Sequence, residues 1–229
     1  MGLYCVRVLP PQVRVGPLPM QVLAAVSVVL AIFAMVPLFS ASGEADDIVN
    51  VSWAWTTEGP EDGIYIGINK FAVASGSDNE AYTWDSDSCN FVQELYGEHF
   101  CNECEHGGSF VIGFAAVFFV FSLFSAAAAV WRAVKPPGLQ QDIIAQHAVV
   151  VCSVVSFIFG VTAVAVFVTT CRRYWPFSGH DYEYGAAAVL TLFVVVAKFF
   201  EVIAHSLVTQ EPLHLKSTLQ AIDDENGQA

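Results

Sequence analysis

Charged side chains are scarce in this chain of 229 residues, where they make up 14% of the sequence. A soluble domain has about 25%. Basic residues are the scarcest, because nine Lys and Arg are scattered among 22 Asp and Glu and leave a formal net charge of −13. Binding of nucleic acid needs clustered basic side chains, so we exclude a nucleic-acid partner. Instead, 55% of the residues are hydrophobic, which is typical of membrane proteins.

The common signatures of enzymes are also missing from the sequence. It contains no G-x-S-x-G, no Walker loop and no H-E-x-x-H, which are the spacings typical of hydrolase, nucleotide and metalloprotease sites. We therefore expect a protein that is not an enzyme, and we assign it no catalytic residue, no metal site and no cofactor.

Four apolar runs of roughly 18–25 residues stand out along the chain. A helix of about 20 residues crosses the hydrocarbon of a bilayer, and backbone amides cannot stay unpaired in lipid, so each run must be helical. The first run could also be a signal peptide cleaved near Ser40-Ala41-Ser42, but its length favours a retained span. The sequence thus predicts an all-α transmembrane four-helix bundle.

These runs divide the chain into helices and connecting segments. We expect cytoplasmic segments at 1–21, 135–146 and 209–229, membrane helices at 22–40, 109–134, 147–170 and 185–208, and extracellular or lumenal loops at 41–108 and 171–184. The positive-inside rule supports this orientation, since five basic residues lie on the side of the termini and three on the other. Asn50-Val51-Ser52 is an N-glycosylation acceptor pattern, which also favours the plasma membrane or the secretory pathway over an organelle.

The 41–108 loop holds fourteen Asp and Glu against one Lys. It also contains nine aromatic residues, whereas disordered acidic segments are poor in aromatics. Alternation at period 2 predicts a strand over 49–55, with Val49, Val51, Trp53 and Trp55 on one face, and a strand over 64–68, with Ile64, Ile66 and Ile68 on one face. The turn-forming residues 58–63 would join them as an antiparallel hairpin, and we expect 76–89 to be less regular.

Four cysteines fall on the predicted outer side: Cys89, Cys101, Cys104 and Cys171. They allow three pairings, of which we favour Cys89 with Cys101 and Cys104 with Cys171; closure of Cys101 on Cys104 is the competing choice. The C-x-x-C spacing could also hold zinc together with His99 and His106, or carry out thiol redox chemistry. Nearby glutamates raise the pKa of a thiol, which favours structural bridges.

Small and polar residues mark particular helix faces. Small residues recur at Cys152, Ser156 and Gly160 and at Ser125 and Ala129, which predicts close helix packing within the bundle or against another protein. Lys198, Glu201 and His205 lie near one face of the last helix. We expect a Lys198–Glu201 pair near the inner boundary, with Lys198 snorkelling. An ion or proton path is the alternative, although the other three spans offer no matching carboxylate or Lys.

The order of these features resembles the claudin-like superfamily of four-span proteins, which includes claudins, the peripheral myelin protein and amastins. That family has a loop signature of Trp, then Gly-Leu-Trp, then two cysteines, and this chain has Trp53, Gly63-Ile64-Tyr65, Cys89 and Cys101. Tyr65 replaces the family's Trp, and the interval from Tyr65 to Cys89 is longer.

The hairpin and the cysteines together predict a small antiparallel β-structured, disulfide-bridged extracellular or lumenal loop. The resemblance implies non-enzymatic work in membrane organisation, adhesion or barrier formation. We expect membrane lipids and other membrane proteins as partners, in a homo- or hetero-oligomer. An accessory subunit of a larger membrane complex, such as a channel, is the alternative. A thiol-redox enzyme or a transporter is a third hypothesis.

Overall fold

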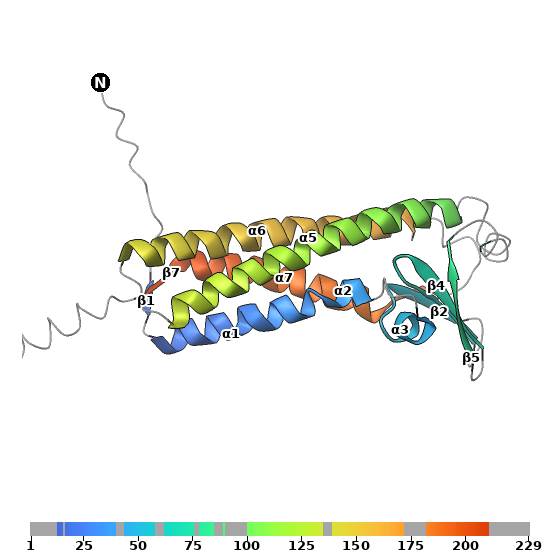
Figure 1. Cartoon of the computed structure of the whole chain (residues 1–229), viewed down its shortest axis with the longest axis horizontal. Helices are drawn as coiled ribbons and strands as arrows, with labels where there is room; N and C mark the ends of the chain where they lie inside the picture. The colour runs from blue at the N-terminus through green and yellow to red at the C-terminus, as the bar shows by residue number, and fades with distance from the viewer. Residues whose placement is uncertain are drawn as a thin grey trace, which may run out of the picture.

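The computed structural model of the chain is an elongated bundle of helices with a small sheet at one end (Figure 1). It describes residues 13–15, 17–39, 44–57, 62–75, 78–84, 89, 100–134, 139–171 and 182–210. The bundle consists of α1 (Pro17–Phe33), α5 (Phe100–Val134), α6 (Leu139–Thr170) and α7 (Ala186–Leu207). A short helix, α2 (Val36–Phe39), continues α1 toward the sheet.

The described residues contain four helices long and apolar enough to cross a membrane, with α1 and α2 counted as one. This confirms the predicted four-span architecture. Large apolar side chains project outward from the bundle; Phe193 and Phe200, for example, are each 62% exposed. Such side chains are costly in water and suited to lipid.

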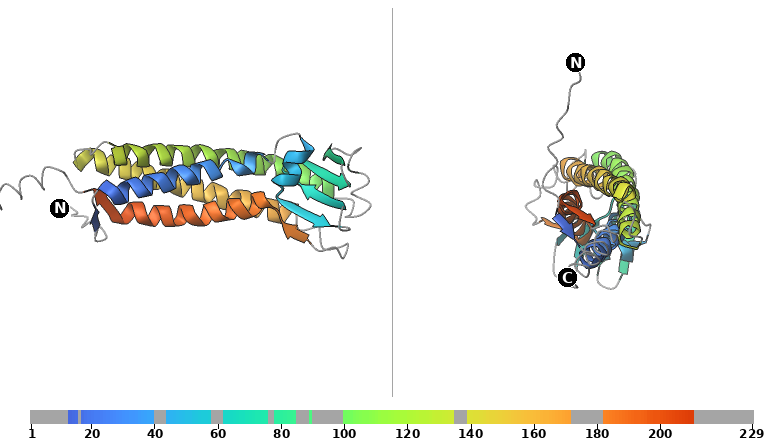
Figure 2. Two further views of the ribbon diagram at one scale, coloured as in Figure 1. Left: turned by 90° about the horizontal axis from the view of Figure 1, so that it is seen from below. Right: turned by 90° about the vertical axis from the view of Figure 1, so that its left-hand side faces the viewer.

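Two helices are longer than the predicted spans. α5 begins at Phe100 rather than at 109, and α6 begins at Leu139 rather than at 147. Their 35 and 32 residues exceed the about 20 needed for hydrocarbon. Both extensions are stabilised by packing, because they bury Cys101 and Cys104 under the sheet and Asp142 inside the bundle. α5 packs most extensively on α6, and α1 and α7 complete the bundle, as the end-on view in Figure 2 shows.

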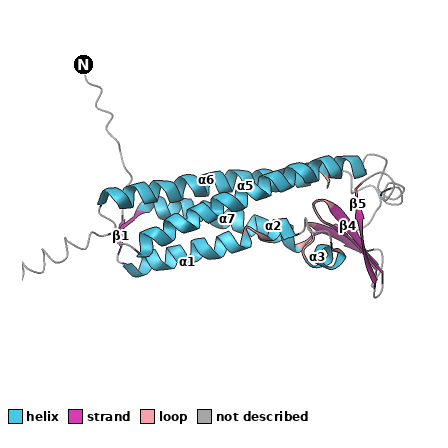
Figure 3. Ribbon diagram, in the orientation of Figure 1, coloured by secondary structure: helices cyan, strands magenta, loops and turns pink. Residues whose placement is uncertain are grey.

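A sheet lies at one end of the bundle (Figure 3). It is antiparallel and has five strands in the order β5-β4-β3-β2-β6. Its strands are β2 (Ala54–Thr57), β3 (Asp62–Ile66), β4 (Lys70–Ser75), β5 (Asp78–Thr83) and β6 (Tyr182–Tyr184). The first four follow one another in the first loop, whereas β6 comes from the second loop and pairs with β2. A short helix, α3 (Ala45–Asn50), packs on the sheet. We call this sheet together with α3 the cap.

The predicted hairpin is present as β2 and β3, and Ile64, Ile66 and Ile68 are all buried. The strand predicted over 49–55 is wrong at its start, because residues 45–50 form α3 and the strand begins at Ala54. Asp46 and Asp47 occupy the first turn of α3, where the helix dipole favours negative charge, and Ile48 is buried.

The irregular structure predicted over 76–89 is wrong for 78–83, which form β5. The polar residues at the start of this strand conceal its alternation. Pairing of Phe71 with Tyr82, whose rings stack with centroids 5.4 Å apart, supports β5 against β4. The alternation of residues within 78–83 could not reveal this strand, because the contacts that stabilise it come from the neighbouring strand β4.

The cap is joined closely to the helices. Trp53 is fully buried, and its ring centroid lies 4.9 Å from that of Phe167 on α6. The start of α7 is hydrogen-bonded to the cap, since the Gly185 amide donates to the Trp53 carbonyl and the Ala187 amide donates to the Ser52 carbonyl, both over 2.9 Å. A Cβ on Gly185 would lie 2.1 Å from the Ser52 carbonyl oxygen, so only glycine fits this approach. At the far end of the bundle, β1 (Val13–Val15) pairs in parallel with β7 (Val208–Gln210).

Candidate functional site

The three polar residues predicted in the last span lie on the buried face of α7. Lys198 and His205 are fully buried, and Glu201 is 5% exposed. Lys198 Nζ lies 2.6 Å from Glu201 Oε2, which is the ion pair expected from the sequence. The predicted snorkelling is wrong, because the whole Lys198 side chain is buried inside the bundle. A pair this far from water depends on neighbouring helices for its remaining polar contacts.

Hydroxyl groups from two other helices hold the Glu201 carboxylate. Ser27 of α1 and Ser125 of α5 both donate to Glu201 Oε1, over 2.5 and 3.1 Å. The Ser125 hydroxyl is also 2.7 Å from the Ser153 hydroxyl on α6. All three serines are fully buried. One carboxylate on α7 therefore links every helix of the bundle through direct or relayed hydrogen bonds.

A second buried ion pair joins α5 to α6. Arg132 Nε and Nη2 donate to the two carboxylate oxygens of Asp142, over 2.8 and 3.3 Å. Arg132 Nη1 also lies 3.2 Å from His205 Nδ1, and Gln146 Nε2 donates to the His205 carbonyl over 2.7 Å. These contacts connect the second pair to α7. We call the nine side chains of both groups the polar cluster: Ser27, Ser125, Arg132, Asp142, Gln146, Ser153, Lys198, Glu201 and His205.

The sequence reasoning missed the second pair. It placed Asp142 in a cytoplasmic loop and Arg132 near the end of a span, and it expected no matching carboxylate or Lys in the other three spans, whereas Asp142 lies within the candidate span Gln141–Thr170. That expectation is wrong. A signal is present in the sequence, because Arg132 precedes Pro136-Pro137-Gly138 by four residues and Asp142 follows this segment by four. Opposite charges at equal distances from a short break between two helices can meet where the two helices pack together.

The polar cluster occupies only the half of the bundle remote from the cap. Toward the cap, the Ser122 and Ser156 hydroxyls form one further polar contact, over 2.7 Å. Beyond that pair the interior is a cluster of apolar side chains from three helices: Leu30, Ala34, Phe118, Val194 and Val195. Between this apolar cluster and the cap, the described part of the helices buries one further polar side chain, Thr191, whose hydroxyl donates to the Ala187 carbonyl of its own helix over 2.6 Å. The polar cluster itself therefore stops short of the cap. The arrangement fastens four helices together, with two buried cations balanced by two buried anions.

The predicted small-residue faces point into the bundle. Ser125, Ala129, Ser156 and Gly160 are buried, and Cys152 is half-buried with a free thiol. The Ser156 hydroxyl donates to the Phe118 carbonyl on α5 over 3.1 Å. A Cβ on Gly160 would lie 2.5 Å from the Val195 side chain and 3.0 Å from Phe118. These positions therefore serve packing within the chain.

Two disulfides stabilise the cap: Cys89–Cys101, with a Cα–Cα distance of 6.2 Å, and Cys104–Cys171, with 4.8 Å. These are the pairs favoured from the sequence, and both distances suit a disulfide. Cys104–Cys171 links the start of α5 to the residue that follows α6, so it joins the cap-side ends of these two helices covalently. Because Cys101 and Cys104 belong to separate bridges, their thiols are engaged and cannot act as a zinc or redox pair while the bridges last. His99 lies outside the described residues.

The residues of the loop signature divide between the interior of the cap and its surface. Trp53 and Ile64 are buried and Gly63 lies on β3, whereas Tyr65 is half-buried and stacks on Trp55. Asn50 is exposed at the end of α3. In β5 the Tyr82 hydroxyl donates a hydrogen bond to the Glu80 carboxylate, which raises the pKa of that phenol above its ordinary value.

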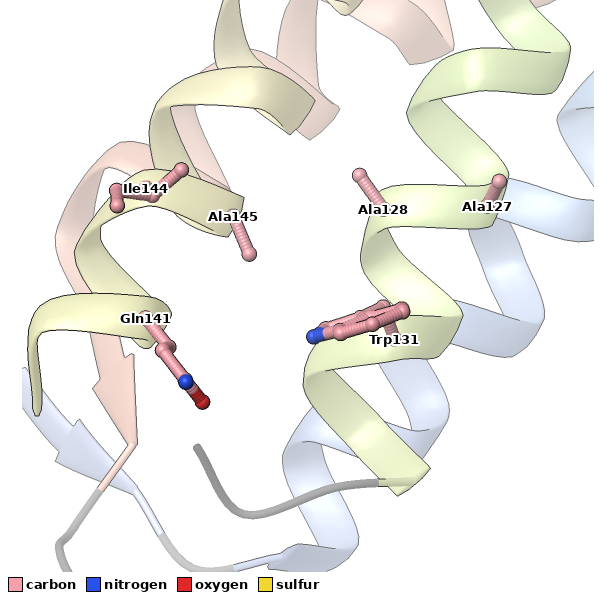
Figure 4. Close-up of a pocket in the computed structure, with 6 residues that line it drawn as sticks. All are labelled: Ala127, Ala128, Trp131, Gln141, Ile144 and Ala145. Atoms are coloured by element: carbon pink, nitrogen blue, oxygen red, sulfur yellow. The ribbon is translucent and has the colours of Figure 1, made fainter. Parts of the chain in front are cut away.

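Two apolar grooves run along the flanks of the bundle. One, of about 450 Å³, lies between α5 and α6 and is lined by Ala127, Ala128, Trp131, Gln141, Ile144 and Ala145 (Figure 4). The other, of about 390 Å³, lies between α1 and α7. Both lie within the membrane-spanning lengths of their helices. The walls of the first groove carry no Asp, Glu, His, Cys or Lys, so they suit an apolar occupant rather than catalysis.

No protein-family model matches the chain, and no curated protein matches it in sequence. The claudin-like resemblance therefore stays a prediction based on topology and a few loop residues. The polar cluster, the cap and the grooves are the features from which a function can be inferred.

Proposed function

We propose that the chain is a non-enzymatic, four-pass membrane protein that acts in membrane organisation, adhesion or barrier formation through contacts made by its cap. The cap would lie on the extracellular or lumenal side of the plasma membrane or of a secretory-pathway membrane. The Cys104–Cys171 bridge is the observation that carries this proposal. It ties the start of α5 to the end of α6, and both of its cysteines are buried in the core that the inner face of the sheet shares with the helices. The bridge thus supports the cap as a rigid surface on which contacts can form at low entropic cost.

Two further observations support this function. Disulfides persist in oxidising compartments, which favours an outer position for the cap. The polar cluster ends at an apolar layer that includes Phe118 and Val195, so the described interior favours a structural role over transport. The acidity of the 41–108 loop, with fourteen acidic residues and one Lys, would speed encounter with basic partners, an effect that salt screens.

The test is accumulation of the tagged, full-length chain at contacts between cells. We expect the wild-type chain to concentrate at contacts, and we expect the Cys104→Ser/Cys171→Ser variant to spread evenly at equal surface level. Cys152→Ser is the matched control, because it removes a thiol that forms no disulfide, and it should behave as wild type. An even distribution of the correctly inserted wild-type chain contradicts the proposal.

Sidedness has a separate test at Asn50, which is exposed on α3. With the cap outside the cytoplasm, we expect enzymatic removal of N-glycans to increase the gel mobility of the wild-type chain. The Asn50→Gln variant should already migrate at the faster position. Digestion of the 41–108 loop by protease supplied only from the cytoplasmic side would overturn the proposed orientation.

An accessory subunit of a larger membrane complex is the second candidate, and the α5–α6 groove favours it. Ala127, Ala128 and Ala145 give this groove small walls within the membrane, and small residues allow a partner helix to approach closely. A fixed large complex on native gels in mild detergent would support this function. Ala145→Trp should release the partner, whereas Ile158→Trp, at an exposed position elsewhere on α6, should not.

A further inference from the structure

The sheet of the cap has one face toward the helices and one face away from them. Ile64, Ile66 and Phe71 on the first face are buried in the core shared with α5, α6 and α7. The second face carries α3, which packs on β3, β4 and β5. The Asn79 amide of β5 donates to the Asp46 carboxylate of α3 over 2.8 Å, which places α3 over this face.

Beside α3, two aromatic rings lie on the same outer face. Trp55 of β2 and Tyr65 of β3 are partners in the strand register. Their ring centroids are 6.2 Å apart and their planes differ by only 12°, and both residues are half-buried. Buried aromatic residues usually serve packing, but this pair stands on the sheet face away from the core and is partly open to solvent. It therefore offers an aromatic surface to a ligand.

A carboxylate lies next to this aromatic pair. Glu183 of β6 is exposed and is the register partner of Trp55 on the other side of β2. Directly paired residues of an antiparallel ladder have Cβ atoms about 4.5–5.5 Å apart and project on the same face. Glu183, Trp55 and Tyr65 therefore form one row across three adjacent strands, and the row combines residues from both loops.

We propose that the row Glu183–Trp55–Tyr65 is a binding site for an arginine side chain of a basic partner protein. A guanidinium group can stack flat on an aromatic face and donate two hydrogen bonds to an adjacent carboxylate. The row offers both groups side by side. A second copy of the cap is a poor occupant, since two loops that each carry a net charge of −13 repel each other. The inference rests on the proposed function, since it names the partner class for the cap.

The test is a titration of the full-length chain in nanodiscs with a hexa-arginine peptide, followed by tryptophan fluorescence and calorimetry. We expect Trp55→Leu and Glu183→Gln each to weaken binding by about five- to tenfold. Trp55→Phe keeps an aromatic face and should stay within about threefold of wild type. Because Trp55→Leu removes a side chain that packs on the sheet, thermal unfolding of each variant is measured alongside. Trp55→Phe keeps an aromatic ring at this position, so it tests the role of the aromatic face even if the Leu variant unfolds.

Two matched controls separate this site from general attraction to an acidic loop. Glu105→Gln removes an exposed carboxylate of α5, and Phe124→Leu removes an exposed aromatic ring of the bundle that lines neither groove; neither should change the affinity. Equal weakening by Glu105→Gln and Glu183→Gln, or unchanged binding by Trp55→Leu, overturns the inference. If the peptide binds as expected while the wild-type chain fails to accumulate at cell contacts, the proposed function fails and the binding site stands.

Discussion

Arg132 and Asp142 form a bidentate ion pair whose side chains are 0% and 3% exposed. The pair joins α5 to α6, and it lies beside His205 of α7. Burial of separate charges carries a large desolvation cost, so such a pair is stable only when both partners are present and hydrogen-bonded. The arginine meets that condition, since its Nη1 lies within hydrogen-bond distance of His205 Nδ1 and its Nη2 also donates to the Val208 carbonyl.

Loss of one partner of this pair should destabilise the bundle strongly. We expect Asp142→Asn to lower the free energy of unfolding by about 3–5 kcal/mol, because it leaves the Arg132 guanidinium buried without a counter-charge. The measurement is an unfolding titration with a denaturing detergent. Arg132→Met/Asp142→Leu should regain most of the loss. Gln141→Ala, at an exposed neighbour, is the control; a change for Asp142→Asn no larger than for this control would show that water reaches the pair.

The Lys198–Glu201 pair should behave as a coupled unit. We expect Lys198→Met and Glu201→Gln each to destabilise the protein, whereas the double substitution should cost less than the sum of the two, with a coupling of about 0.5–3 kcal/mol. The same unfolding titration, arranged as a double-mutant cycle, measures this coupling. Ser206→Ala removes only a hydrogen bond within α7 and serves as the control. Additive effects would mean that the two charges do not stabilise each other in the membrane.

The four spans could be predicted because a segment that crosses the hydrocarbon must be about 20 residues long and must pair its backbone amides within a helix. The helix extensions could not be predicted, since their stability comes from contacts such as Cys104 with Cys171 and Arg132 with Asp142, which the chain forms only after folding. Periodicity identified Ile64 and Ile66 as a buried face. It missed β5, whose partner is another strand, and β6, a three-residue strand from the second loop.

Three of the nine side chains of the polar cluster were predicted from the sequence as polar residues within a span. Lys198, Glu201 and His205 share one helix face, so spacing alone revealed them. Ser125 was predicted only as a small residue for helix packing and Ser27 was not predicted at all, because serine is common in membrane helices and hydrogen-bonds readily to its own backbone. Their role depends on the position of Glu201 between helices, which a sequence pattern does not contain.

The two disulfides should differ in their contribution to stability. Cys104–Cys171 closes a separation of 67 residues and Cys89–Cys101 closes one of 12. The chain-entropy relation gives about 4 kcal/mol for the longer loop and about 3 kcal/mol for the shorter. We expect Cys104→Ser/Cys171→Ser to lower the unfolding temperature more than Cys89→Ser/Cys101→Ser, as measured by circular dichroism in detergent.

Alkylation of the native protein provides the control for this comparison. Of the five cysteines that the structure describes, only Cys152 is free, so among these five Cys152 alone should take up a membrane-permeant alkylating reagent before reduction. Uptake of the reagent at Cys104 or Cys171 in the native protein would contradict the bridge between the ends of α5 and α6.

A side chain at Gly160 should lower the stability of the bundle, and a side chain at Gly113 provides a matched comparison. A Cβ at Gly160 would lie 2.5 Å from Val195 and 3.0 Å from Phe118, whereas a Cβ at Gly113 would meet nothing within 4 Å. Both glycines lie within long helices, where alanine is intrinsically favoured by roughly 0.5–1 kcal/mol. We therefore expect Gly113→Ala to stabilise the protein slightly and Gly160→Ala to destabilise it by about 1–3 kcal/mol through overpacking. Gly160→Ala combined with Val195→Ala should recover part of this loss, because the smaller residue removes the nearest contact. Equal stability of the two single variants would mean that α6 and α7 are not packed closely at this level of the membrane.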